Sequence, residues 1–217
     1  MSYRPARVAA KATAALALLP CLLTAACQDD RVGTDRSHPQ PVPATLSGLG
    51  TLTAGPSGLR MTAFGTDASH APDGAAVTAM PATAEEGQEW LVRPTAGPEL
   101  VLQSPLLSSG EDRTGPLVLT ADPDGSVYLA AERPGSAPEA AAPDQSWTFE
   151  DLAVAPTRWT APDGRSATRL RIHAHGGGCL VDRGYGERLA LGGCEDPAAW
   201  WTAEGLSGPG GDDRPTL

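Results

Sequence analysis

Pairs of histidines and aspartates are the first groups in this sequence whose types and spacing could do chemistry. His173 and His175 lie two residues apart in a β-prone segment, so a strand would place both imidazoles on one face, as half of a metal site. Nothing nearby completes that site. Asp122, Asp124 and Ser126 are spaced like the start of a calcium loop, but no glutamate stands at the twelfth position. We expect no metal ion and no cofactor, and interpret these residues as a solvated strand face and a turn.

The motifs of covalent and metal-dependent catalysis are missing. The sequence has no G-x-S-x-G and no H-E-x-x-H, and no spacing among its scattered carboxylates singles out a glycosidase pair. Lys11 is the only lysine, so the rest of the chain has no amine for Schiff-base chemistry or for a Walker-type phosphate site. The net charge of −10 disfavours nucleic acid as a partner. We expect a protein that is not an enzyme.

The N-terminus has the layout of a secretory signal peptide over residues 1–26. A basic leader is followed by an uncharged apolar stretch and by small residues before Cys27. The segment Leu23-Thr24-Ala25-Ala26-Cys27 resembles a bacterial lipobox, with Thr24 in place of the preferred leucine. The resemblance implies that Cys27 is acylated and anchors an exported protein at the outer face of the cell membrane. Ordinary cleavage before an unmodified Cys27 is the alternative.

Two further cysteines remain in the exported chain. Cys21 leaves with the signal peptide and Cys27 is the proposed lipid site, which leaves Cys179 and Cys194. In an oxidising compartment these two predict a disulfide, which would contribute on the order of 3 kcal/mol by closing a loop of about 15 residues. A zinc site is the alternative, but two thiols without a C-x-x-C partner make a poor one.

The pattern beyond the signal peptide predicts an all-β domain. Residues 27–45 are polar and proline-rich and predict an extended tether. From residue 46 to about 206, short β-prone runs alternate with turn residues, and no window sustains a helical stripe. The triplet Pro-Asp-Gly at 72–74, 123–125 and 162–164 is typical of turns. We expect a sandwich or a barrel, followed by a disordered tail, 207–217.

A repeated Gln-x-Trp pattern divides this domain into three. Gln88 precedes Trp90 and Gln145 precedes Trp147, and a third copy has Ala198 before Trp200. The indoles recur at intervals of roughly 55 residues, so we define unit 1 as about 46–94, unit 2 as about 95–154 and unit 3 as about 155–206. An Ala/Pro-rich stretch, 133–143, lengthens unit 2 as a surface loop.

The glutamine and the tryptophan of each copy are expected to point into the core together. Residues i and i+2 of a strand share a face, so the indole fills the core while the amide satisfies buried backbone groups. By the same alternation, Trp201 should point outward.

The repeated pattern resembles the Q-x-W signature of the ricin B-type β-trefoil. The resemblance covers about 46–206 and is strongest in unit 3, where "GGGCLVDRGYGERLALGGCEDPAAWW" contains a Gly-Cys-Leu start, an intra-repeat cysteine pair and a terminal tryptophan. It implies a β-trefoil of three pseudo-symmetric, four-stranded repeats. A generic β-sandwich is the alternative.

The resemblance also implies where a sugar could bind. Functional members of that family use an aspartate shortly after the Cys-Leu phrase, an aromatic platform and often an asparagine or glutamine. Asp182 and Tyr185 match in unit 3, although Asp182 stands one position late and the sequence contains no asparagine. In unit 2 the corresponding groups are Asp122, Asp124 and Tyr128.

These expectations combine into an exported, lipid-anchored, non-catalytic module that binds a carbohydrate at the cell surface. The first alternative is a structural or protein-interaction lipoprotein whose trefoil has lost sugar binding and whose partner is a cell-surface protein. The second is a secreted hydrolase, which would require a carboxylate pair.

Overall fold

The computed structural model describes residues 46–67, 69–83, 86–109, 115–135, 140–152, 158–160 and 166–207. For residues 86, 158–160 and 166 it describes the backbone alone. The expected signal peptide, the tether with Cys27, the Pro-Asp-Gly triplet at 162–164 and most of the expected tail lie outside these residues. The described part belongs to one compact unit, Pro39–Leu217.

Strands account for nearly all of the regular structure in the described part. Fourteen strands form one sheet. They are β1 (Gly48–Ala54), β2 (Arg60–Ala63), β3 (His70–Ala71), β4 (Val77–Met80), β5 (Trp90–Pro94), β6 (Leu100–Ser108), β7 (Pro116–Ala121), β8 (Val127–Ala131), β9 (Trp147–Asp151), β10 (Arg158–Thr160), β11 (Ser166–Ala174), β12 (Cys179–Val181), β13 (Ala190–Gly192) and β14 (Trp200–Glu204). Short 3-10 helices precede three of them: η1 (Glu86–Gln88), η2 (Pro143–Gln145) and η3 (Pro197–Ala199). Among the described residues, no helix has the length and hydrophobicity to cross a membrane.

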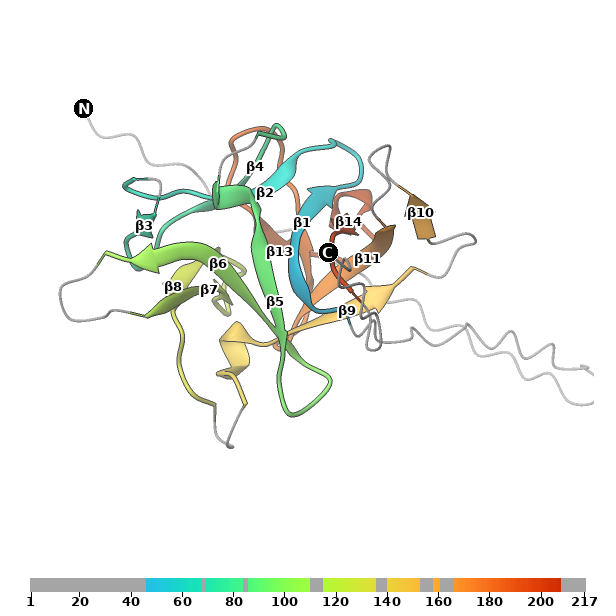
Figure 1. Ribbon diagram of the computed structural model, residues 1–217. Helices are drawn as coiled ribbons and strands as arrows, with labels where there is room; N and C mark the ends of the chain where they lie inside the picture. Colours follow the sequence, from blue (N-terminus) through green and yellow to red (C-terminus); the bar gives the residue numbers. More distant parts are fainter. Residues whose placement is uncertain are drawn as a thin grey trace, which may run out of the picture. The chain divides into compact units, whose positions relative to one another are not determined.

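Six of the strands close into a barrel (Figure 1). Antiparallel pairing runs from β1 to β5, β6, β9, β11 and β14, and β14 pairs with β1 again. Closure leaves no unpaired edge among these strands, so their backbone groups cannot pair with the edge of another molecule.

Three hairpins cover one end of this barrel. They are β2–β4, β7–β8 and β12–β13, and each first strand also pairs with a barrel strand of its own unit. Each unit therefore contributes two barrel strands and one hairpin. This arrangement is a β-trefoil, which confirms the predicted fold class. The strands β3 and β10 are additions that pair with β6 and β11.

The hairpins also bond to one another. The amide of Leu129 donates to Ala75 O at 2.9 Å, which joins units 2 and 1, and the amide of Leu189 donates to Val77 O at 2.9 Å, which joins units 3 and 1. The amide of Leu191 donates to Gly125 O at 2.8 Å, which joins units 3 and 2. All three units therefore meet at the hairpin end of the barrel.

Three buried indoles join the barrel to the hairpins. Trp90, Trp147 and Trp201 are each 0% exposed and lie in the same core cluster. Each indole N–H donates to a carbonyl in the first hairpin strand of its own unit. The acceptors are Met61 O at 3.0 Å, Leu119 O at 2.9 Å and Leu180 O at 2.9 Å. The three units thus place their indoles in equivalent surroundings.

The assignment of Trp200 to the core was wrong, and so was the expectation that Trp201 points outward. Trp200 is 37% exposed, and the guanidinium of Arg169 lies 5.9 Å from the centroid of its ring. The reason is a slip of one residue. The 3-10 helix η3 ends at Ala199, as η1 and η2 end at Gln88 and Gln145, so Ala199 rather than Ala198 takes the glutamine position. On a strand, such a slip exchanges the two faces.

Units 1 and 2 secure their hairpins through a buried glutamine, as expected. Gln145 donates to Thr120 Oγ1 at 3.2 Å and to Ala131 O at 3.0 Å, and it accepts from Arg133 N at 2.8 Å. Gln88 makes the same three kinds of contact in unit 1, with Thr62 Oγ1, Pro81 O and Thr83 N. The amide therefore links each 3-10 helix to the first strand of its hairpin and to the chain at or just after the end of the second strand.

Unit 3 replaces this network with apolar packing and a covalent bond. The positions of the glutamine and the threonine are taken by Ala199 and Val181, which are buried with Cys179 in a separate small cluster. The predicted disulfide between Cys179 and Cys194 is confirmed. It joins β12 to the segment after β13, and so closes the hairpin of unit 3.

The two adjacent tryptophans give a test of the register. Trp201→Ala should lower the free energy of unfolding by about 3–5 kcal/mol, because it empties a core position and leaves Leu180 O without its donor. Trp200→Ala should cost less than about 1 kcal/mol, because it removes only a partly exposed ring and its contact with Arg169. Urea unfolding of both variants measures the difference. Equal losses would contradict the register.

Candidate functional site

The turn between β7 and β8 carries two of the acidic residues predicted to bind a ligand. Asp122 N donates to Ser126 O and Gly125 N donates to Asp122 O, both at 2.9 Å, so the predicted Pro123-Asp124-Gly125 turn is closed by backbone bonds. Gly125 has φ of 90°, which favours glycine at this position.

Asp124 is held by the same turn. Its Oδ1 accepts the amide of Ser126 at 2.9 Å. Hydrogen bonds from the Ser126 amide and then from its side chain lower the pKa of Asp124 below its ordinary value. The carboxylate is exposed to solvent and stays charged to a lower pH than an ordinary aspartate.

Tyr128 lies outside the core because strand residues alternate. Its neighbours Val127 and Leu129 are buried, while Tyr128 is half-buried on the opposite face of β8. The phenol donates to Asp122 Oδ1 at 2.9 Å. Burial, followed by this hydrogen bond and the charge of Asp122, raises the pKa of Tyr128 above its ordinary value.

A cleft of about 510 Å³ lies at the hairpin end of the trefoil, and we call it the cap cleft. Asp124 and Tyr128 line it from unit 2. The loop 183–188 of unit 3 contributes Arg183 and Arg188, and Gly74 comes from unit 1. An acidic, an aromatic and two basic residues thus line a volume typical of small-molecule sites.

The contacts between hairpins position the backbone of the cap cleft. Tyr128 forms a β-bridge with Ala76 of unit 1, and Arg188 forms one with Thr78 of the same unit. Ser126 forms a third bridge, with Ala190 of unit 3. The side chains therefore start from a backbone that is fixed without a ligand, which lowers the entropic cost of binding.

A second hollow of about 470 Å³, the side cleft, borders the unit 2 turn and shares Asp124, Gly125 and Leu191 with the cap cleft. Asp122 and Asp124 line it together with Asp144 and His175. Asp144 pairs with Arg133 and His175 contacts Glu99, so both already have partners within the chain. The turn 122–125 therefore borders two hollows, and the cap cleft is the one that Tyr128 also lines.

The predicted residues of unit 3 have different surroundings. Asp182 is 8% exposed, and its carboxylate accepts from Ser57 Oγ at 2.5 Å and from Gly184 N at 2.8 Å. Tyr185 is 67% exposed. Neither residue lines the cap cleft or the side cleft. Asp182 stabilises the start of the loop 183–188, and so acts on the cap cleft through the backbone.

The two histidines do not converge. His173 contacts Glu150 and the disulfide, whereas His175 contacts Glu99. In the described part of the chain, His173, Cys179 and Cys194 bring possible ligand atoms within 4.8 Å of one another. The two sulfurs are bonded to each other, however, and a metal requires thiolates.

Sequence reasoning missed Arg183 and Arg188. The segment "DRGYGER" contained a signal, because it places two arginines among glycines in an acidic chain. Gly184 and Gly186 have φ of 107° and 75°, so the loop turns at two positions where other residues are strained. Neither arginine forms an ion pair within the described residues, whereas Arg93, Arg133 and Arg171 each do.

Comparison with known proteins identifies the fold. No protein-family model matches the chain, and none of the curated proteins matches its sequence. A designed threefold-symmetric protein, ThreeFoil, is similar in structure with a TM-score of 0.51 and 16% identity, over 72% of this chain and 98% of that one. An exo-β-1,3-galactanase from Clostridium thermocellum has a TM-score of 0.51 and 12% identity, over 72% of this chain and 30% of the galactanase.

A mosquitocidal holotoxin has a TM-score of 0.50 and 10% identity, over 73% of this chain and 17% of the toxin. The chain thus matches less than a third of the length of the galactanase and of the toxin. At these identities the similarity shows the fold alone. That fold agrees with the strand pairing and with the β-trefoil implied by the Q-x-W resemblance.

The bond between Tyr128 and Asp122 gives a test by pH. Because the pKa of Tyr128 is raised on folding, its contribution to stability is full below the pKa of tyrosine in the unfolded chain and is lost as pH rises through the folded value. Asp122→Asn should lower the pKa of Tyr128, because it removes the negative charge beside the phenol while burial remains.

Alkaline titration of tyrosinate absorbance measures this pKa, and Tyr128→Phe identifies which part of the signal belongs to Tyr128. The same titration curve in wild type and Asp122→Asn would show that burial alone raises the pKa.

Proposed function

We propose that this protein is a non-catalytic carbohydrate-binding module whose site is the cap cleft. One observation carries the proposal: Asp124 and Tyr128, both expected to contact a sugar, line one cleft with Arg183 and Arg188. We further propose that acylation of Cys27 anchors the module at the outer face of the cell membrane, as the resemblance to a lipobox implies.

The groups in the cap cleft suit a ligand rich in hydroxyls. An ionised carboxylate accepts hydrogen bonds from neighbouring hydroxyls, and Asp124 is ionised at neutral pH like any exposed aspartate, with a lowered pKa that extends this to more acidic solution. An aromatic ring covers the apolar C–H face of a sugar, which is the role of Tyr128. The phenol of Tyr128 already bonds Asp122, so the orientation of the ring is restrained before a ligand arrives.

Arg183 and Arg188 add donors to this set. A guanidinium has five N–H donors and no hydrogen-bond acceptor, so it complements the carboxylate of Asp124, which has acceptors alone. Sugar hydroxyls both donate and accept, and a cleft with both kinds of group can therefore satisfy them in pairs.

The comparisons agree with this proposal at the level of fold. The name of one similar structure, the exo-β-1,3-galactanase, refers to an enzyme that acts on a polysaccharide. Among the described residues, Asp124 is the only acidic residue that lines the cap cleft, so these residues supply no carboxylate pair there. A single carboxylate suits binding rather than glycoside hydrolysis, which in most families requires two.

A glycan array probed with the purified full-length chain tests the proposal. Asp124→Asn should weaken binding of the recognised glycan by about 10- to 100-fold, because it replaces charge-assisted hydrogen bonds while keeping an acceptor for Ser126 N. Arg188→Ala should weaken binding by a similar factor. Glu187→Ala is the matched control, because Glu187 is exposed in the same loop and does not line the cap cleft.

Two results would overturn the assignment. Binding that is unchanged in Asp124→Asn and Arg188→Ala would remove the site from the cap cleft. Failure to bind any glycan, together with co-purification of a cell-surface protein that survives excess sugar, would favour a protein-interaction lipoprotein. The hydrogen bond that Ser57 donates to Asp182 favours that alternative for unit 3, because this carboxylate already has a partner within the chain.

A further inference from the structure

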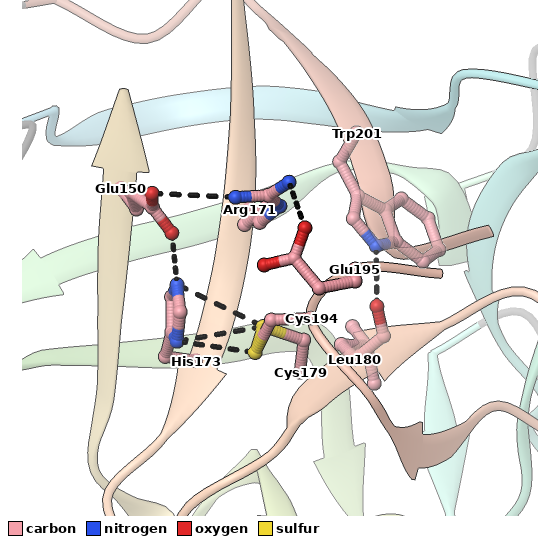
Figure 2. The surroundings of a disulfide bond; sticks show 8 residues. All are labelled: Glu150, Arg171, His173, Cys179, Leu180, Cys194, Glu195 and Trp201. Carbon is pink, nitrogen blue, oxygen red and sulfur yellow. Dashed lines mark hydrogen bonds and ion pairs between the residues drawn. A yellow bond between two sulfur atoms is a disulfide. The ribbon is translucent and has the colours of Figure 1, made fainter. Parts of the chain in front are cut away.

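The disulfide of unit 3 has an ionisable group packed against it, and neither fold nor sugar binding accounts for this contact. His173 Nδ1 lies 3.4 Å from Cys179 Sγ and 3.5 Å from Cys194 Sγ. The other ring nitrogen, Nε2, lies 2.6 Å from Glu150 Oε2. Figure 2 shows the imidazole between the carboxylate of Glu150 and the two sulfurs.

This arrangement is specific to unit 3. In unit 3, His173 on the barrel strand β11 is the register partner of Cys179 on the hairpin strand β12. The equivalent partners are Thr53 and Arg60 in unit 1, and Gln103 and Val118 in unit 2. A disulfide that only closes a hairpin needs no imidazole beside it. The histidine is therefore an addition that the structural role of the disulfide does not require.

The charged groups around the sulfurs come from three segments. Glu150 on β9 contacts both His173 and Arg171, and Arg171 also approaches Glu195, the residue after Cys194, at 3.9 Å. Arg171 thus offsets part of the negative charge of the two glutamates (Figure 2). Within this cluster, the imidazole is the group in contact with sulfur.

The two ends of the disulfide differ in exposure. Cys179 is 0% exposed, whereas Cys194 is half-buried beside Glu195, whose side chain is 96% exposed. A thiol from solution therefore reaches Cys194 more readily than Cys179. Attack on Cys194 makes Cys179 the leaving sulfur, next to His173.

We propose that Cys179–Cys194 is a thiol–disulfide exchange site in which the Glu150–His173 pair stabilises the Cys179 thiolate. The thiolate of a dithiol reductant attacks Cys194 Sγ, the bond to Cys179 Sγ breaks, and its electron pair stays on Cys179. The second thiolate of the reductant then attacks the mixed disulfide and releases Cys194. The reductant is oxidised to its disulfide, and its two protons end on the two cysteines.

The imidazole acts through charge in this scheme. When His173 is protonated, Glu150 holds the positive ring beside the sulfur on which negative charge develops. A stabilised leaving thiolate speeds exchange, since the rate depends on how easily that sulfur departs. His173 is thus a positioning and charge-stabilising residue for a reaction at the disulfide.

The rate of reduction by dithiothreitol under native conditions tests the proposal on the purified full-length chain. His173→Ala should slow the reduction by about tenfold. This factor assumes that losing the imidazole raises the pKa of the leaving Cys179 thiol by about one unit and that the rate falls in proportion. A histidine that serves only packing predicts the opposite sign, because its loss would loosen the hairpin and speed reduction. His175→Ala is the matched control, since that imidazole lies two residues further along the chain, just after β11, and contacts Glu99.

Two further measurements separate charge from packing. His173→Gln, which keeps a polar side chain but carries no charge at any pH, should slow the reduction by a similar factor to His173→Ala, whereas a packing role predicts a smaller effect. With glutathione in place of dithiothreitol, mass spectrometry should find the mixed disulfide on Cys194. An equal or faster rate in His173→Ala, or an adduct on Cys179, would overturn the proposal.

Discussion

The bond from a buried indole N–H to a hairpin carbonyl is the constraint on which the rest of this structure depends. An indole fully removed from water has one donor, and leaving that donor unpaired costs about as much as a lost hydrogen bond. In each unit the acceptor lies in the first hairpin strand, so filling the core with Trp90, Trp147 or Trp201 also fixes where the hairpin sits. The same bond occurs three times around one barrel, and it therefore places three hairpins against one another.

The cap cleft follows from that placement. Its lining comes from the turn of unit 2, the loop of unit 3 and Gly74 of unit 1, and no single unit contains the whole set. The bridges of Tyr128 to Ala76 and of Arg188 to Thr78 exist because the hairpins meet. A change that displaced one hairpin would therefore alter the cleft without touching any residue in it.

Much of the fold could be predicted from the sequence, because its signals were local. The two Gln-x-Trp copies, Gln88 with Trp90 and Gln145 with Trp147, have the same spacing and fill equivalent buried positions. The pairing of Cys179 with Cys194 followed from the expectation of an oxidising compartment. The prediction failed at Trp200 because two adjacent tryptophans offer two registers. Only the end of η3 at Ala199 shows which of them faces the core.

The candidate site was less accessible to such reasoning. Asp124 and Tyr128 could be found because a Pro-Asp-Gly turn keeps them close in the chain. The segment "DRGYGER" makes Arg188 conspicuous, but its place in the same cleft as Asp124 depends on contacts between units, which no local pattern in the sequence predicts. The carboxylate of Asp182 matched a family pattern, yet its partner Ser57 comes from unit 1, far away in the chain.

The covalent closure of one hairpin out of three implies an order in which the domain comes apart. Hydrogen-bonded ties such as those of Gln88 and Gln145 open and close in local fluctuations, whereas a covalent cross-link does not. The hairpins of units 1 and 2 should therefore loosen first and expose their backbones to proteases, while the cross-linked segment from Cys179 to Cys194 stays together. As long as the disulfide is intact, the loop that carries both arginines would be the last part of the hairpin layer to be cut.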